Sequence, residues 1–101
     1  MLIYNITYAV PHDICHEWLQ WIQQEHIPEI LATGYFERHQ LLKLLELDES
    51  ESLTFACQFY TQTEGQYRNY ITEYAPGLRL KANQRWGDQV IGFRTLMETV
   101  K

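Results

Sequence analysis

Of the four histidines in this sequence, His26 is the candidate for acid–base chemistry. His26 follows Glu25 and comes two residues before Pro28, at the end of a predicted helix. A neutral imidazole has an unperturbed pKa of about 6.5, so it can accept a proton or bind a ligand near neutral pH. The commoner role of a histidine at a helix C-terminus is to cap the last carbonyl groups. His26 is the one catalytic candidate, and no neighbouring residue completes a catalytic unit with it.

Four polar residues in predicted strands are candidates for binding a ligand. They stand among apolar neighbours: Asn5, Arg38, Gln58 and Arg94. The guanidinium of Arg94 could hold a carboxylate through two parallel hydrogen bonds. If these residues share the face of the sheet that carries no helix, they form a polar patch in a pocket or at a dimer interface. The alternative is a satisfied hydrogen-bond network that sets strand register and dimer pairing.

A metal site is the remaining chemical possibility. His12, Cys15 and His16 have the i, i+3, i+4 spacing that places side chains on one face of a helix. Closed zinc sites use three or four protein ligands, and no further ligand is marked by spacing, so we interpret these residues as a solvated first turn. The chain has no glycine-rich phosphate loop and no nucleophile elbow. The sequence therefore predicts neither a metal nor a cofactor.

Length and charge exclude one class of partner. The chain has 101 residues, which predicts a single domain over residues 1–101. The net charge is −5, and residues 1–37 contain no lysine or arginine. An acidic half repels phosphate backbones, so we expect no nucleic-acid partner.

The apolar segments and the cysteines predict the cellular compartment of the protein. No apolar run approaches the roughly 20 residues that span a bilayer, so we expect no membrane association. The apolar start of the chain has no basic segment before it and no cleavage site after it, unlike a signal peptide. Cys15 and Cys57 fit no disulfide framework. We therefore expect a cytoplasmic protein with reduced thiols.

The elements that must position these residues alternate between strand and helix. Residues 2–10 are β-branched and aromatic, which predicts a strand with its even-numbered side chains on one face. A helix follows, with Asp13 as a plausible N-cap. Pro28 predicts a break in this helix at residue 27, before a short turn that ends at Gly34.

The second half of the chain contains a strand whose composition favours a helix. Residues 35–47 have that composition, but the clear strand at 53–60 follows a polar turn and needs an antiparallel neighbour. We therefore predict that 35–47 is a strand, with its leucines buried on both faces. A helix that begins at Thr63 and is divided by Pro76, and a last strand at 89–99, complete the chain.

The resulting order is β-α-β-β-α-β, the split pattern of ferredoxin-like domains. It predicts an α+β fold with a four-stranded antiparallel sheet and helices on one face. The other face carries apolar residues from two strands, which favours a partner. The simplest partner is a second copy of the chain, so we expect a homodimer through the open sheet face.

Several segments together resemble a known family. They run in order from about residue 1 to residue 99: Tyr4-Asn5-Ile6-Thr7, Trp18-Leu19-Gln20-Trp21, His26-Ile27-Pro28, Ala32-Thr33-Gly34, Phe55-Ala56-Cys57-Gln58-Phe59, Glu73-Tyr74-Ala75-Pro76 and Phe93-Arg94-Thr95-Leu96-Met97-Glu98. The chain resembles a bacterial domain family of unknown function that is similar to the dimeric α/β-barrel superfamily. The resemblance implies two sheets face to face and a cleft between each sheet and its helices. It implies no reaction, because that superfamily includes monooxygenases, haem-degrading enzymes, isomerases and binding proteins.

Three hypotheses about function remain open. The first is a small homodimeric binding or interaction protein without chemistry of its own, since no catalytic constellation is visible. The second is a cofactor-independent enzyme, monooxygenase- or isomerase-like, acting on a small aromatic or carbonyl compound. His26 would be its base, and Arg94, Asn5 or Gln58 would orient the substrate. The third and weakest hypothesis is haem binding through His26.

Overall fold

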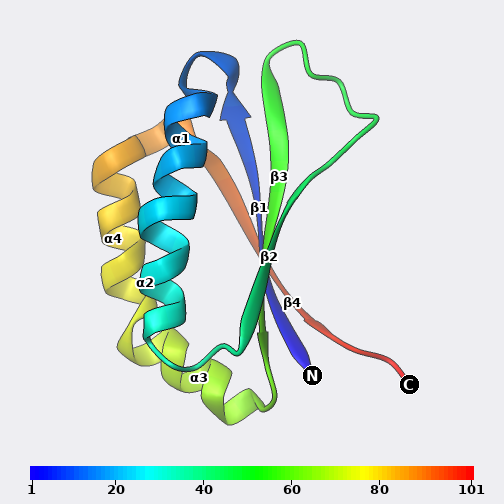
Figure 1. Ribbon diagram of the computed structural model, residues 1–101, viewed down its shortest axis with the longest axis vertical. Helices are drawn as coiled ribbons and strands as arrows, with labels where there is room; N and C mark the ends of the chain where they lie inside the picture. Colours follow the sequence, from blue (N-terminus) through cyan, green and yellow to red (C-terminus); the bar gives the residue numbers. More distant parts are fainter.

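Four strands form one antiparallel sheet in the order β2-β3-β1-β4 (Figure 1). The computed structural model describes residues 1–101. The strands are β1 (Leu2–Pro11), β2 (Arg38–Lys43), β3 (Ser52–Thr61) and β4 (Ile91–Glu98). The two central strands, β1 and β3, are the most apolar, as expected for strands that have neighbours on both sides.

The helices all lie on one side of this sheet (Figure 1). They are α1 (Cys15–Trp21), α2 (Ile27–Ala32), α3 (Glu64–Glu73) and α4 (Ala75–Trp86), with short turns η1 (His12–Ile14), η2 (Ile22–His26) and η3 (Gly87–Gln89). The order β-α-β-β-α-β is the predicted one, and the ferredoxin-like α+β fold is confirmed. None of the helices combines the length and apolar character needed to cross a membrane.

The core lies between the helices and one face of the sheet. Even-numbered residues of β1, such as Tyr4 and Ile6, pair across the ladder with odd-numbered residues of β3, such as Phe59. Trp18 of α1 is fully buried against this face, with its ring 5.1 Å from that of Tyr8. Large aromatic side chains therefore hold the first helix against the sheet.

The predicted break before Pro28 is wrong. The backbone stays helical through this segment, and Pro28 stands in the first turn of α2, a position that proline tolerates. The residues before it form one wide π turn, η2, and the Ile27 N–H bonds the Ile22 carbonyl five residues back. His26 is the last residue of that turn, and such turns are frequent at functional sites.

Other predicted boundaries shift by a few residues. Asp13 is not the N-cap of α1, because it lies within the 3-10 turn η1 and Ile14 precedes the helix. Thr63 does cap α3, and its Oγ1 accepts from the Gln66 N–H at 3.2 Å. The chain divides at Tyr74, so that α4 begins just before Pro76 and the predicted division is confirmed.

The segment whose composition favours a helix is a strand, as predicted. Only its central part pairs with β3, and it forms an edge of the sheet. Its leucines are not buried on both faces of the single chain. Leu41 is half-buried beneath the helices, whereas Leu42 points to the other face and is 41% exposed. Burial of that face requires something outside this chain.

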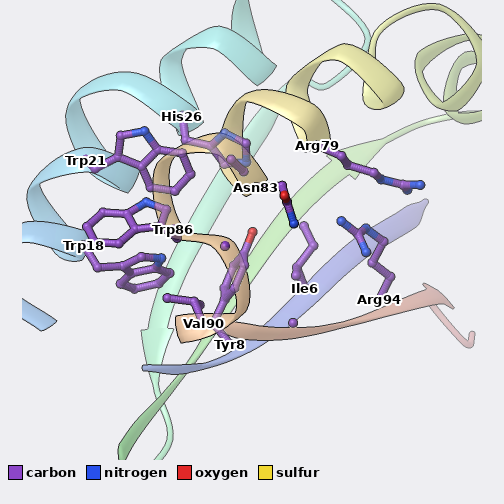
Figure 2. Close-up of a pocket in the computed structure, with 13 residues that line it drawn as sticks. Ile6, Tyr8, Trp18, Trp21, His26, Arg79, Asn83, Trp86, Val90 and Arg94 are labelled. Atoms are coloured by element: carbon purple, nitrogen blue, oxygen red, sulfur yellow. The ribbon is translucent and has the colours of Figure 1, made fainter. Parts of the chain in front are cut away.

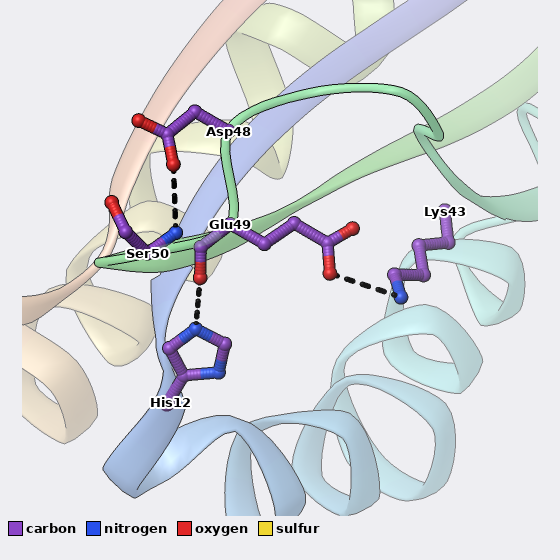
Figure 3. A network of polar contacts seen from close by, with 5 residues as sticks. All are labelled: His12, Lys43, Asp48, Glu49 and Ser50. Carbon is purple, nitrogen blue, oxygen red and sulfur yellow. Dashed lines mark hydrogen bonds and ion pairs between the residues drawn. The ribbon is translucent and has the colours of Figure 1, made fainter.

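The loop between β2 and β3 is held by polar contacts (Figure 3). The Ser50 N–H donates to Asp48 Oδ1 at 2.9 Å, and this bond lowers the pKa of the Asp48 carboxyl. The Glu49 carboxylate pairs with Lys43 at 3.7 Å, and its backbone carbonyl contacts the His12 ring. His12 is therefore a loop contact in this fold.

Candidate functional site

A cleft of about 150 Å³ lies between the sheet and the helices (Figure 2). Thirteen residues from β1, α1, η2, α4 and β4 and the segment around η3 line it: Ile6, Tyr8, Trp18, Trp21, His26, Arg79, Ala82, Asn83, Trp86, Gly87, Val90, Gly92 and Arg94. A cavity of about 150 Å³ is large enough to hold benzene. The cleft therefore matches a compound built on one planar ring.

One wall of the cleft is made of tryptophan. All three tryptophans of the chain contribute, and the rings of Trp21 and Trp86 meet edge to face at 5.8 Å. On the sheet side, a Cβ added to Gly92 would lie 3.4 Å from the Tyr8 ring. The glycine thus lets the Tyr8 ring lie close to the backbone of β4. These flat surfaces suit a flat ligand.

His26 borders the cleft with an unbonded imidazole. The ring stacks on Trp21 at 4.5 Å and 19°, is 9% exposed, and makes no hydrogen bond to another residue. Burial lowers the pKa of His26 to about 4, although the nearby Glu29 carboxylate acts in the opposite direction. The imidazole is therefore neutral at pH 7 and keeps one nitrogen free to accept a hydrogen bond or a proton.

Two further polar groups project into the same space. Figure 2 shows the hydroxyl of Tyr8 directed toward the middle of the cleft, where Asn83 of α4 lies. Burial raises the pKa of Tyr8 far above its usual range, so the hydroxyl stays protonated. Neither side chain hydrogen-bonds to another residue. Both are available to a ligand.

A pair of arginines forms the opposite end of the cleft. Arg79 of α4 donates through Nη2, and Arg94 of β4 through Nε, to the same hydroxyl oxygen of Tyr4, each at 3.2 Å. Neither guanidinium takes part in an ion pair. Figure 2 shows both side chains at the end remote from the tryptophans. The cleft thus has an aromatic end and a cationic end.

The structure separates the residues that the sequence singled out. His26 and Arg94 border the same cleft, whereas Asn5, Arg38 and Gln58 lie on the opposite, open face of the sheet. The hypothesis that these strand residues share the open face holds for Asn5, Arg38 and Gln58 and fails for Arg94. Arg94 pairs with Ile6, whose side chain faces the helices, and a register of this kind is not readable from one strand alone.

The open face carries a polar row across its middle. One residue from each strand contributes in register: Gln40, Gln58, Asn5 and Thr95. The Asn5 amide donates to Thr7 Oγ1 at 3.1 Å, but its Oδ1 is buried without any donor. Beside the row, the guanidinium of Arg38 lies 3.7 Å from the centre of the Tyr60 ring. The row is therefore only partly satisfied within one chain.

The residues considered as metal ligands do not converge. No three His, Cys, Asp or Glu side chains in the chain are grouped so as to hold an ion. His12 contacts the loop before β3, and Cys15 is buried, which raises the pKa of its thiol. Of the first turn interpreted as solvated, His12 and His16 are exposed, whereas Cys15 is buried.

Most of the residues that line the cleft cannot be identified from the sequence. Tyr8 looks like an ordinary core residue of a strand, and Arg79 suits the negative end of a helix dipole. Asn83 and Trp86 belong to no sequence motif. They meet only because β4 pairs with β1 and α4 packs across both, so no local pattern could have marked them.

Comparison with known proteins places the chain by family and by fold. A family model described as "Domain of unknown function (DUF4286)" matches residues 1–100. No curated protein sequence matches.

Solved structures of similar fold cover nearly the whole chain. An ethyl tert-butyl ether D (EthD) family protein from Bacillus halodurans has a TM-score of 0.69 at 12% identity, over 99% of this chain and 100% of its own. SnoaB, a cofactor-independent oxygenase from Streptomyces nogalater, has a TM-score of 0.64 at 15% identity, over 99% and 94%. A dimeric ferredoxin-like protein from an uncultured marine organism has 0.63 at 13%, over 100% and 96%. Likeness at these identities establishes the fold and leaves the reaction open.

Proposed function

Because the chain belongs to the family of the domain of unknown function DUF4286, whose description assigns no activity, we propose a function from the cleft itself. The protein binds a small planar compound, aromatic or carbonyl-containing, between the sheet and its helices. The observation that carries this proposal is His26, a buried neutral imidazole with no hydrogen-bond partner, in a cleft walled by tryptophans. The ring nitrogens of His26 are not among the buried side-chain atoms without a partner, so they are accessible and a ligand donor can bond one of them directly.

The binding unit is a homodimer through the open sheet face. That face exposes Phe93 by 67% and Ile91 by 57% on one edge strand and Leu42 by 41% on the other, and its central Asn5 Oδ1 lacks a donor. A second sheet laid on this face covers the apolar side chains and can supply the missing hydrogen bond. The dimeric ferredoxin-like protein from the marine organism is a precedent for such pairing.

The protein works in the cytoplasm. Cys15 and Cys57 are free and buried, and burial raises the pKa of Cys57 to about 12. Thiols of this kind are inert structural residues and are typical of a reducing compartment.

Binding in the cleft is testable with a simple aromatic probe. Benzamide is expected to bind with a dissociation constant of about 1 mM, as its size allows. It should shift the three tryptophan indole N–H resonances in a ¹⁵N–¹H correlation spectrum, because all three tryptophans line the cleft. Backbone resonances of the β2–β3 loop, which lies toward the edge of the sheet opposite β4, should not move.

A cleft-filling variant and its matched control locate the binding. Ala82→Phe places a ring in the cleft and is expected to abolish the shifts, whereas Ala32→Phe, on the exposed end of α2, is expected to leave them unchanged. Equal shifts in wild type and Ala82→Phe would show that benzamide binds elsewhere, and the proposal would be withdrawn.

A second candidate function is proton abstraction by His26. The specific observation is the position of the free imidazole in the same cleft as the Tyr8 hydroxyl and, at its other end, two guanidinium groups that could stabilise a developing negative charge. On its other side His26 borders a hollow lined by the exposed Glu25 and by Glu29, which can pass a proton to solvent. A base with a pKa of about 4 is weak, so we place this candidate second. SnoaB is a precedent for cofactor-independent chemistry on this fold.

The base can be tested with 5-nitrobenzisoxazole, a planar carbon acid. The imidazole would take the ring C–H proton, the C–H electron pair would form the nitrile, and the N–O bond would break to release a coloured phenolate. We expect a rate that rises through pH 4 and is level above about pH 5.5, since the neutral imidazole is the active form. His26→Phe should remove this rate and His16→Phe should not. A rate that survives in His26→Phe excludes His26 as the base.

A further inference from the structure

We propose that the compound bound in the cleft is an organic carboxylate, held by Arg79 and Arg94, with its planar body against the tryptophans. This inference rests on the proposed binding function and adds the chemical class of the ligand. It concerns the end of the cleft formed by α4 and β4, where the two guanidinium groups lie beside the hydroxyl of Tyr4.

The charge at this end of the cleft is uncompensated. The thirteen residues that line the cleft include two arginines and no aspartate or glutamate, although the chain as a whole has a net charge of −5. The four ion pairs of the protein involve other residues. Two like charges that share one neutral acceptor repel each other, and an anion between them removes that repulsion. Arginine pairs of this kind match the two oxygens of a carboxylate.

Hydrogen-bond donors at the cleft exceed the acceptors. Arg79 Nε and Trp86 Nε1 are buried and have no acceptor in the chain. The Tyr4 hydroxyl oxygen accepts from both arginines, and its own proton has no acceptor either. Buried donors without partners are rare and costly. Trp86 lies at the aromatic end, so the donors that concern a carboxylate are those of Arg79 and Tyr4. A ligand that satisfies these donors must bring acceptor atoms, which a carboxylate has and an amine or other cation lacks.

The shape of the cleft gives the ligand its orientation. Figure 2 shows Arg79 and Arg94 at one end and Trp18, Trp21 and Trp86 at the other, with Ile6 between them. A carboxylate at the arginine end leaves the planar body of the ligand beside the indole rings. The space of about 150 Å³ matches a body of about one ring. The ligand class is therefore a small aromatic or conjugated carboxylate.

Benzoate and benzamide separate this proposal from the one on which it rests. The two probes have nearly the same shape, and only benzoate is charged at pH 7.5. We expect benzoate to bind at least about tenfold more tightly, as charge-assisted hydrogen bonds predict, measured by titrating the tryptophan indole resonances. Arg94→Gln and Arg79→Gln should each remove this preference, weakening benzoate binding much more than benzamide binding. Arg94→Lys, which keeps the charge without the planar fork, should retain only part of it.

Arg68→Gln is the matched control, because it removes the same charge from the exposed face of α3. It should leave the preference for benzoate intact, with folding of every variant checked by circular dichroism. Equal affinity for both probes in wild type would overturn the carboxylate proposal and leave the binding proposal standing. A preference lost equally in Arg68→Gln would assign it to net charge and overturn the arginine pair. No shift with either probe would overturn both proposals.

Discussion

Replacing Phe93 by glutamate is expected to leave the protein monomeric at micromolar concentration, whereas the wild type is a dimer. Phe93 stands on β4 in the open sheet face and is 67% exposed in the single chain. In the proposed dimer this side chain is covered by the partner sheet, so each introduced carboxylate would be buried without a cation. Such burial costs several kcal/mol, and every 1.4 kcal/mol changes a dissociation constant tenfold. We expect the dimer dissociation constant to rise more than about a hundredfold, measured by light scattering during size-exclusion chromatography.

The control for this variant places the same charge on the other side of the molecule. Leu80 of α4 is also largely exposed, at 59%, but α4 lies on the helical side of the sheet (Figure 1). Leu80→Glu is therefore expected to remain a dimer. A dimeric Phe93→Glu, or a dimer lost equally in both variants, would show that the open face is not the interface.

Lowering the pH from 7 to 5 is expected to cost about 2 kcal/mol of unfolding free energy through His26 alone. Burial holds the pKa of His26 at about 4 in the folded protein, against about 6.5 in the unfolded chain. Between these values the unfolded chain binds more protons than the folded one. The stability is therefore fully present above about pH 6.5 and is lost as the pH falls toward 4.

Urea unfolding at the two pH values isolates this contribution. The carboxylates also titrate in acid, so the informative quantity is the difference between wild type and a variant without the imidazole. His26→Phe keeps a ring that can stack on Trp21 and should lose about 2 kcal/mol less than wild type. His16→Phe, at an exposed position, should behave like wild type. An identical loss in wild type and His26→Phe would mean that His26 is not held neutral by burial.

The order and type of the elements follow from local patterns. Alternation of apolar residues in 2–10 and 53–60 marks the two central strands, and both form as predicted. The strand at Arg38–Lys43 was predictable against its own composition, because the strand that follows it needs an antiparallel neighbour. Local rules failed at Pro28, since Ile27 keeps α-helical backbone angles (φ −60°, ψ −47°) although a residue before proline favours an extended backbone.

The candidate site was predictable only in part. His26 was identifiable as an ionisable residue at the end of a helix, and Arg94 as a polar residue in an apolar strand. Their meeting in one cleft was not, nor was the separation of Arg94 from Asn5 and Gln58. A shift of one residue in register moves every side chain of a strand to the other face of the sheet. The residues of β4 do not by themselves fix its register with β1.

The sequence by itself determines which helices and strands form and which residues alternate along them. It also shows that His26 has no partner nearby in the chain. All of these features depend on neighbours within a few residues. Only the tertiary structure decides that His26 is buried and neutral, that the guanidinium groups of Arg79 and Arg94 share the Tyr4 hydroxyl, and that the tryptophans close one end of the cleft. Those properties depend on strand pairing and helix docking between residues up to 90 positions apart. The pKa of a buried group and the charge balance of a cleft are set by such long-range neighbours, which no local pattern encodes.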